Sequence, residues 1–177
     1  MSQPATLADL PPAPANAIRL NKLVRAPRER VYQLWTDPVA FPKWFAPGPN
    51  TACRDVTMDV RVGGAFRFAM NDGSKDHVGI GAYTVVDPPN TLAFTWSWEG
   101  MPDFGGDSLV TIRFFDAANP HDDGPGTEVV LTHERLDSAV ERSEHTGGWW
   151  DTLRALGYFA RGVDPREAMY GQPTASV

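Results

Sequence analysis

The sequence contains a single cysteine, Cys53, among its 177 residues. One cysteine can form neither an internal disulfide nor a thiolate cage around a metal ion. Basic residues are also scarce: 16 Lys and Arg stand against 22 Asp and Glu, the formal net charge is -6, and the basic residues form no cluster. Because phosphate binding needs clustered Lys and Arg, this balance disfavours a nucleic acid or an anionic membrane surface as partner.

Long apolar runs are missing as well. No stretch approaches the roughly 18 consecutive apolar residues of a membrane helix. The start of the chain lacks the basic residues and apolar run of a secretory signal, so we expect a cytoplasmic protein. With 42% apolar and 21% charged residues, the composition is typical of a folded globular protein, and the length fits one domain.

The chain also lacks the common catalytic and nucleotide-binding motifs. There is no Gly-x-Ser-x-Gly nucleophile elbow and no catalytic cysteine signature, which makes a hydrolase improbable. Gly63-Gly64 and Gly79-x-Gly81 do not stand between a strand and a following helix, as phosphate-binding loops do. They indicate turns and bends of a curved sheet instead.

A metal site is not predicted either. The four histidines, His77, His121, His133 and His145, show no His-x-x-x-His spacing. Asp116 with Asp122-Asp123 lacks the spacing of a calcium-binding EF-hand and indicates a solvated hairpin tip. We therefore expect no metal and no cofactor. His133 and His145 could still converge at one end of a groove, or serve as structural hydrogen-bonding groups.

The two ends of the chain differ from its middle. Residues 1–16 are rich in Pro and Ala without a hydrophobic period, which predicts a flexible leader. Residues 163–177 indicate a loose tail. We place one folded domain at residues 17–162.

Within this domain the hydrophobic period changes along the chain. Alternation over residues 18–24 predicts a strand, and Val31, Leu34 and Trp35 share one face of a following short helix. A second short helix is expected to carry Phe41, Trp44 and Phe45. From residue 51 to residue 135 the period is two, with Gly, Pro, Asn and Asp between the runs, which predicts an antiparallel meander.

The last regular element is predicted to be a long helix. Ser138 and Glu141 have the spacing of a capping box, so a helical segment is expected to begin there. We expect the main helix from about Gly147 to Arg161, with His145 before it. Gly147-Gly148 would permit close approach of helix and sheet, or form a flexible gate. One apolar stripe of this helix consists of Trp149, Trp150, Leu153, Leu156 and Ala160.

Five segments in this order carry a resemblance to a known family: VRAPRERVYQLWTDPVAFPKWFAP (24–47), VGGAFRFAMNDG (62–73), GAYTVVDPPNTLAFTW (81–96), GTEVVLTHERL (126–136) and HTGGWWDTLRAL (145–156). The chain resembles the START-like or SRPBCC superfamily, and within it the C-terminal domain of activators of the heat-shock protein 90 ATPase. The resemblance implies an α+β helix-grip fold, in which a curved antiparallel sheet of about six to seven strands surrounds a long C-terminal helix, with two short helices after the first strand.

The resemblance also implies a cavity between the helix and the sheet. Its candidate lining consists of the large apolar residues on the inner faces and one histidine: Trp44, Phe45, Phe66, Phe68, Met70, Tyr83, Phe94, Trp96, Trp98, His133, Trp149 and Leu153. The alternative is that most of these rings pack a dry core.

Three functions stay open at this point. The first is non-catalytic binding of a small apolar molecule by a monomer or homodimer, and the second is docking on a chaperone or another protein in the stress response. The third is a cyclase-like enzyme whose pocket groups would be Arg67, Tyr83, Thr132 and His133. An enclosed cavity with buried polar groups favours the first or the third, whereas a filled core beside an exposed apolar patch favours docking.

Overall fold

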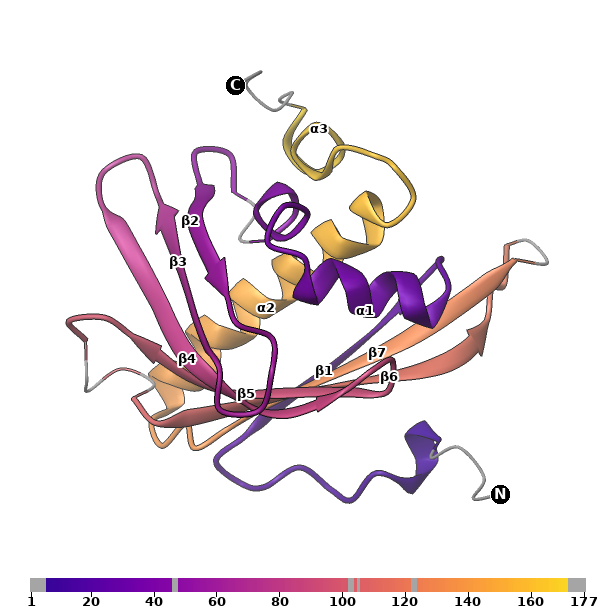
Figure 1. Ribbon diagram of the computed structural model, residues 1–177, viewed down its shortest axis with the longest axis horizontal. Coiled ribbons are helices and arrows are strands. Elements are labelled where there is room, and N and C mark those ends of the chain that lie inside the picture. The colour runs from indigo at the N-terminus through magenta and orange to yellow at the C-terminus, as the bar shows by residue number, and fades with distance from the viewer. Residues whose placement is uncertain (1–5, 46–47, 102–103, 105, 122–123, 172–177) are drawn as a thin grey trace.

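The computed structural model describes residues 6–45, 48–101, 104, 106–121 and 124–171. A seven-stranded antiparallel sheet curves around one long helix, α2, so the predicted helix-grip fold is confirmed (Figure 1). The elements follow the order η1 (Leu7–Asp9), β1 (Ile18–Val24), α1 (Arg28–Thr36), η2 (Phe41–Lys43), β2 (Ala52–Met58), β3 (Ala65–Asn71), β4 (Asp76–Asp87), β5 (Thr91–Trp98), β6 (Ser108–Ala118), β7 (Pro125–Glu134), α2 (Ala139–Phe159) and α3 (Pro165–Tyr170). Among these described residues, no helix is both long and apolar enough to cross a membrane.

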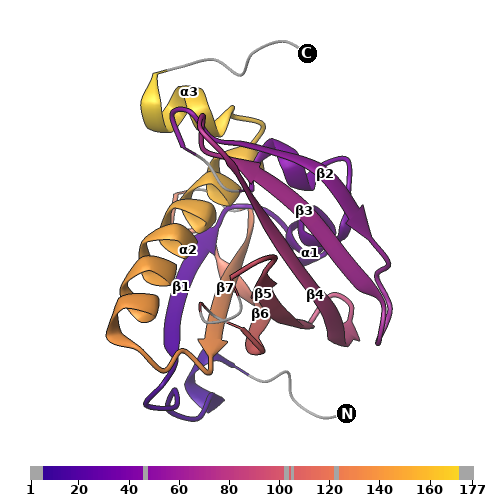
Figure 2. The same ribbon diagram turned by 90° about the vertical axis from the view of Figure 1, so that its left-hand side faces the viewer.

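The strands lie in the order β1-β7-β6-β5-β4-β3-β2, and each neighbouring pair is antiparallel. The first strand thus pairs with the last, with Ile18 opposite His133. The pairing register shifts between Arg54 and Thr57 in β2 and between Tyr83 and Val85 in β4. Such irregularities bend and twist a strand, and Figure 2 shows the sheet wrapping around the side of α2.

Two glycines of β4 allow aromatic rings to lie directly on the strand. Alternation along β3 buries Phe66 and Phe68 on the inner face. A Cβ added at Gly79 would collide with the ring of Phe68, and one at Gly81 would collide with the ring of Phe66 and the carbonyl of Thr95. The Gly79-x-Gly81 motif is therefore a packing feature of the sheet interior.

Helix α2 begins at the predicted capping box. The hydroxyl of Ser138 accepts a hydrogen bond from the Glu141 N–H at 3.0 Å, and the Glu141 carboxylate accepts one from the Ser138 N–H at 2.9 Å. From there the helix runs unbroken through Gly147-Gly148 to Phe159. The expectation that the main helix starts near Gly147 is wrong, because the cap and the buried face outweigh the roughly 1 kcal/mol that each interior glycine costs.

One helix face packs against the sheet, and Trp149, Leu153 and Leu156 are buried on it. Trp150 is 44% exposed, so its assignment to the apolar stripe is wrong. A step of one residue turns the helix by about 100°, which moves Trp150 away from the buried face.

A short helix occupies part of the region for which the sequence predicts only a loose tail. Helix α3 starts at Pro165, after Asp164, whose carboxylate accepts a hydrogen bond from the Arg166 N–H at 2.9 Å. The Arg166 guanidinium donates to the carbonyls of Gly48 and Pro49, at 3.3 and 3.2 Å. These contacts tie α3 to the segment before β2.

Aromatic rings from α1, η2 and the strands fill the centre of the domain. Phe41 stacks on Phe45 with ring centroids 4.2 Å apart, and Trp35 meets Trp44 edge to face at 4.8 Å. The void among these rings measures about 20 Å³. This part of the interior is a packed core.

Candidate functional site

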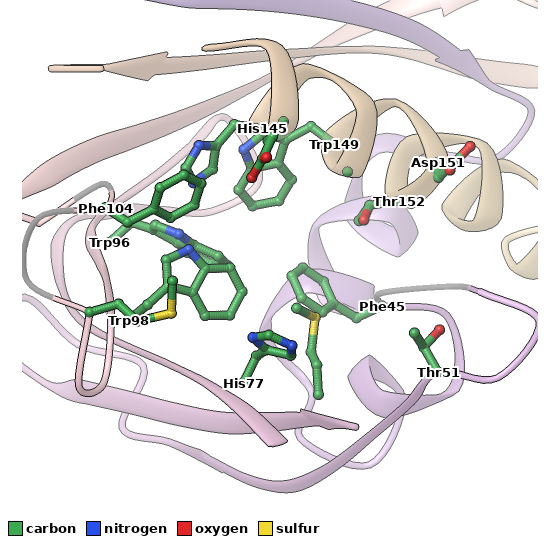
Figure 3. A pocket seen from close by; sticks show the side chains of 14 residues that line it. Phe45, Thr51, His77, Trp96, Trp98, Phe104, His145, Trp149, Asp151 and Thr152 are labelled. Atoms are coloured by element: carbon green, nitrogen blue, oxygen red, sulfur yellow. The ribbon is translucent and has the colours of Figure 1, made fainter. Parts of the chain in front are cut away.

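A pocket of about 360 Å³ lies next to this core, between the middle of α2 and the inner face of β3, β4 and β5 (Figure 3). Its lining surface is mainly apolar, and the lining residues include aromatic rings, two methionines and several polar side chains: Phe45, Thr51, Met70, His77, Trp96, Trp98, Met101, Phe104, Glu144, His145, Gly148, Trp149, Asp151 and Thr152.

Helical and strand periods explain how these side chains meet. His145, Trp149 and Thr152 lie three and four residues apart and therefore share one face of α2. Trp96 and Trp98 are two residues apart and share the inner face of β5. The rings of Trp96 and Trp149 approach each other with centroids 5.1 Å apart, and Phe45 lies 6.0 Å from Trp149. Figure 3 shows the helix and strand residues facing each other across the pocket.

Behind Trp149 runs a chain of buried hydrogen bonds. The indole N–H of Trp149 donates to Nδ1 of His133 at 3.0 Å. Nε2 of His133 therefore carries the proton in the neutral ring and donates to the Ser108 hydroxyl at 2.7 Å. That hydroxyl donates in turn to the Trp96 carbonyl at 2.9 Å. The chain links the helix side of the pocket to the strand side and satisfies every polar group in it.

The two buried histidines are held in the neutral form. Burial, with a smaller contribution from the neighbouring His145, lowers the pKa of His133 to about 3. Burial also lowers the pKa of His145, whose ring lies 4.7 Å from that of His133. Nδ1 of His145 donates to the Glu141 carbonyl at 2.8 Å, so the other ring nitrogen, Nε2, is a hydrogen-bond acceptor.

Three buried nitrogens of the lining have no hydrogen-bond partner among the described residues. They are Nε1 of Trp96, Nε1 of Trp98 and Nε2 of His145. The first two are donors and the third is an acceptor. An unpaired buried polar group costs about 1 to 3 kcal/mol, so a ligand that satisfied one of them would recover part of that cost.

The structure divides the twelve sequence-predicted site residues into two groups. Five line the pocket: Phe45, Met70, Trp96, Trp98 and Trp149. Seven are buried elsewhere: Trp44, Phe66, Phe68, Tyr83, Phe94 and Leu153 belong to the packed core, and His133 lies behind Trp149. His133 and His145 converge at one end of the pocket, as the sequence allowed.

Sequence reasoning missed the polar side of the pocket. His145 and Thr152 stand four residues before and three after Trp149, and Gly148 stands three after His145 and four before Thr152, so helical spacing could have found them. The expectation that His145 precedes the helix concealed this signal. His77 is the second residue of β4 and Phe104 lies in the loop before β6, and no local pattern places either of them at the site.

Neither glycine of the Gly147-Gly148 pair has the packing role expected from the sequence. A Cβ added at either position would meet nothing within 4 Å. Close approach of helix and sheet is therefore not the reason for these glycines. Gly148 faces the pocket, and Gly147 is exposed outside its lining.

The groups considered for cyclase-like catalysis, all of them among the described residues, do not form a common site. Of the four cyclase candidates, Arg67 pairs with Glu99 on the surface and Thr132 accepts a hydrogen bond from Arg19. None of the four lines the pocket. Burial raises the pKa of Cys53 to about 12, which keeps its thiol protonated.

The acidic loop considered for calcium is only partly visible in the structure. Asp116 pairs with Arg28 at 3.2 Å, whereas Asp122 and Asp123 lie outside the described residues. Within the described part of the chain, no group of three or more His, Cys, Asp and Glu side chains is placed to hold a metal ion.

A curved antiparallel sheet that grips one long helix, with a ring-lined pocket between them, defines a domain of the START-like, or SRPBCC, class. The family model described as Activator of Hsp90 ATPase homolog 1-like protein matches residues 25–159. The chain belongs to this family. None of the curated proteins matches it significantly.

Solved structures of bacterial proteins share the fold. Protein CV1439 from Chromobacterium violaceum is 28% identical with a TM-score of 0.68, and the match covers 82% of this chain and 96% of that one. CalU16 from Micromonospora echinospora is 27% identical with a TM-score of 0.58, over 81% and 75% of the two chains. The AHSA1-like protein from Aeromonas hydrophila is 23% identical with a TM-score of 0.58, over 82% and 94%.

Proposed function

We propose that this protein binds a small, largely apolar molecule in the pocket between α2 and the sheet. The observation that carries the proposal is the contrast between two neighbouring ring clusters. The core leaves a void of only about 20 Å³, whereas the pocket beside it measures about 360 Å³. Known ligand pockets are mostly apolar, with volumes of about 300 to 1,000 Å³ and a few convergent polar groups.

Gly148 gives a second line of support. Glycine in a helix interior is about 1 kcal/mol less favourable than alanine, and a Cβ at position 148 would meet no other atom within 4 Å. Packing therefore does not require glycine there. The free space in front of this position belongs to the pocket, and a larger side chain would project into it.

The experiment uses this position to block the pocket without touching the core. N-phenyl-1-naphthylamine is an uncharged fluorescent probe of apolar sites, and we expect the purified protein to bind it with a saturable rise in fluorescence. Gly148→Leu should weaken this binding at least tenfold, because the leucine side chain occupies the pocket. Gly147→Leu is the matched control, since it changes the adjacent residue outside the lining and should leave binding unchanged.

Thermal denaturation shows that both variants are folded before binding is compared. Equal probe binding by the parent and a folded Gly148→Leu variant would contradict the proposal, and so would a parent that binds no probe. A weakening that is equally large in Gly147→Leu would place the probe elsewhere on the helix.

Docking on heat-shock protein 90 is a second candidate, favoured by the family description. A docking site would use exposed side chains, and on α2 these include Trp150, 44% exposed, and Val140, 64% exposed. The test is the rate of ATP hydrolysis by the chaperone with and without this protein. Stimulation that is lost in Trp150→Ala and kept in Gly148→Leu would support docking over ligand binding. No stimulation by the parent protein would dismiss docking.

A further inference from the structure

We propose that the ligand of this pocket is an uncharged aromatic molecule bearing a hydroxyl group, and that fatty-acid anions are excluded. This inference rests on the proposed function, since it names the chemistry of the molecule in the same pocket. Three properties of the lining support it, namely its rings, its charges and its unpaired nitrogens.

The rings of the lining are arranged to hold another flat ring. Trp96 and Trp98 stand edge to face, with centroids 5.2 Å apart and planes at 88°. At the histidine end, the ring of Phe104 stacks on His145 with centroids 5.1 Å apart and planes at 20°. Aromatic pairs in such geometries gain about 0.5 to 1.5 kcal/mol beyond the burial of their area, which an aliphatic chain does not gain.

The charges of the lining disfavour an anion. Glu144 and Asp151 are its carboxylates, and the described lining residues include no Lys or Arg. The guanidinium of Arg154 forms an ion pair with the Asp151 carboxylate at 3.3 Å. His77 is hydrogen-bonded to the Asp72 carboxylate at 2.9 Å. A buried carboxylate on the ligand would therefore lose its hydration without finding a cation in the lining.

The unpaired nitrogens require both a donor and an acceptor from the ligand. Nε2 of His145 accepts, because Nδ1 donates to the Glu141 carbonyl, whereas the indole N–H groups of Trp96 and Trp98 donate. A hydroxyl is the smallest group that both donates and accepts. A hydroxyl can therefore pair with either kind of nitrogen, donating to His145 or accepting from an indole N–H, whereas a carbonyl can only accept and a hydrocarbon can do neither.

A hydroxyl reaches these nitrogens only after a neighbouring side chain turns aside, because all three are closed to solvent in the structure. Met101 is a lining side chain with the freedom to move, since it is unbranched and 39% exposed. The stacking of Phe104 on His145 further indicates that a ring is well accommodated at this end of the pocket.

Three probes with the same ring system separate these features: naphthalene, 2-naphthol and 2-naphthoate, titrated by isothermal calorimetry at pH 7. We expect 2-naphthol to bind about 2- to 10-fold more tightly than naphthalene, as one net hydrogen bond allows. The naphthoate anion should bind at least tenfold more weakly than 2-naphthol. Naphthoate binding as tight as that of naphthol would overturn the exclusion of anions.

Variants then locate the polar contact. His145→Phe keeps a ring and removes the acceptor, so the preference for naphthol over naphthalene should fall to about one. Trp98→Phe should reduce the same preference by removing a donor. His121→Phe changes an exposed histidine outside the lining and should preserve it.

The outcomes distinguish this inference from the proposed function. If naphthalene binds as tightly as naphthol to the parent, or if both pocket variants keep the full preference, hydroxyl recognition is wrong while an apolar pocket remains. If none of the three compounds binds, the proposed function itself fails. Should His145→Phe not fold, the probe ranking on the parent and on Trp98→Phe still decides the question.

Discussion

The indole nitrogen of Trp149 donates a hydrogen bond to Nδ1 of His133 at 3.0 Å, in the interior between helix and sheet. This bond fixes which nitrogen of His133 carries the proton. It also sets the orientation of the Trp149 ring, which lines the pocket. Trp149 therefore both packs the interface and shapes the site.

Replacement of Trp149 should reveal both roles. Trp149→Ala removes a side chain that is 3% exposed, and we expect the free energy of unfolding to fall by about 3 to 5 kcal/mol. Trp149→Phe keeps a ring but leaves Nδ1 of His133 without its donor, and should cost about 1 to 3 kcal/mol. Urea denaturation followed by circular dichroism measures both values. A loss below 1 kcal/mol in Trp149→Ala would contradict the packing described for this helix.

Stability should fall when the solution is acidified below neutrality. His133 and His145 have pKa values lowered by burial, to about 3 in the case of His133, whereas a histidine in the unfolded chain titrates near 6.5. Unfolding therefore takes up protons below about pH 6.5, and the free energy of unfolding decreases as the pH drops from there towards 3. For His133 alone, the loss between pH 7 and pH 5 should be about 2 kcal/mol.

Urea denaturation at pH 7 and pH 5 tests this prediction in a range where carboxylates are mostly ionised in both states. His121→Gln is the control, because that histidine is exposed, and the variant should keep the full loss of stability. Equal stability of the parent at the two pH values would show that the two histidines are not buried in the neutral form.

Two glycine substitutions should change the stability of the protein in opposite directions. Gly79→Ala forces a methyl group into the ring of Phe68, and overpacking of this kind costs about 1 to 3 kcal/mol. Gly148→Ala adds a methyl group in open space on a helix, and should stabilise the protein by about 0.5 to 1 kcal/mol. Thermal denaturation of both variants and the parent measures these changes: the melting temperature should fall in Gly79→Ala and rise in Gly148→Ala. Stabilisation by Gly79→Ala would contradict the close contact of ring and strand.

Local periodicity predicted the fold well, because each element carries its own signal. Alternation placed Phe66, Phe68, Trp96 and Trp98 on inner faces, and the Ser138 capping box marked the true start of α2. The glycine pair obscured the continuity of that helix. Helix propensity is a property of single residues, whereas most of the stability of this helix comes from packing of its buried face against the sheet.

The division between core and pocket could not be predicted in this way. Phe68 and Trp98 both point inward, yet the first is packed against Phe45 and the second lines the pocket. What separates them is how far the rings of η2 and of Phe45, just after it, reach along the sheet, a contact between segments more than 20 residues apart. Neither the period of a strand nor the composition contains this information.

The indole N–H resonances of the protein offer the most direct test of the central claim, that a ligand occupies the pocket between α2 and the sheet. The chain has six tryptophans, and three of them, Trp96, Trp98 and Trp149, line the pocket. In a 15N-labelled sample titrated with N-phenyl-1-naphthylamine, we expect the indole signals of these three to shift together and saturate. The signals of Trp44, in the packed core, and of the exposed Trp150 should stay in place. Shifts confined to Trp150, or no shift at any of the three pocket tryptophans, would contradict the account.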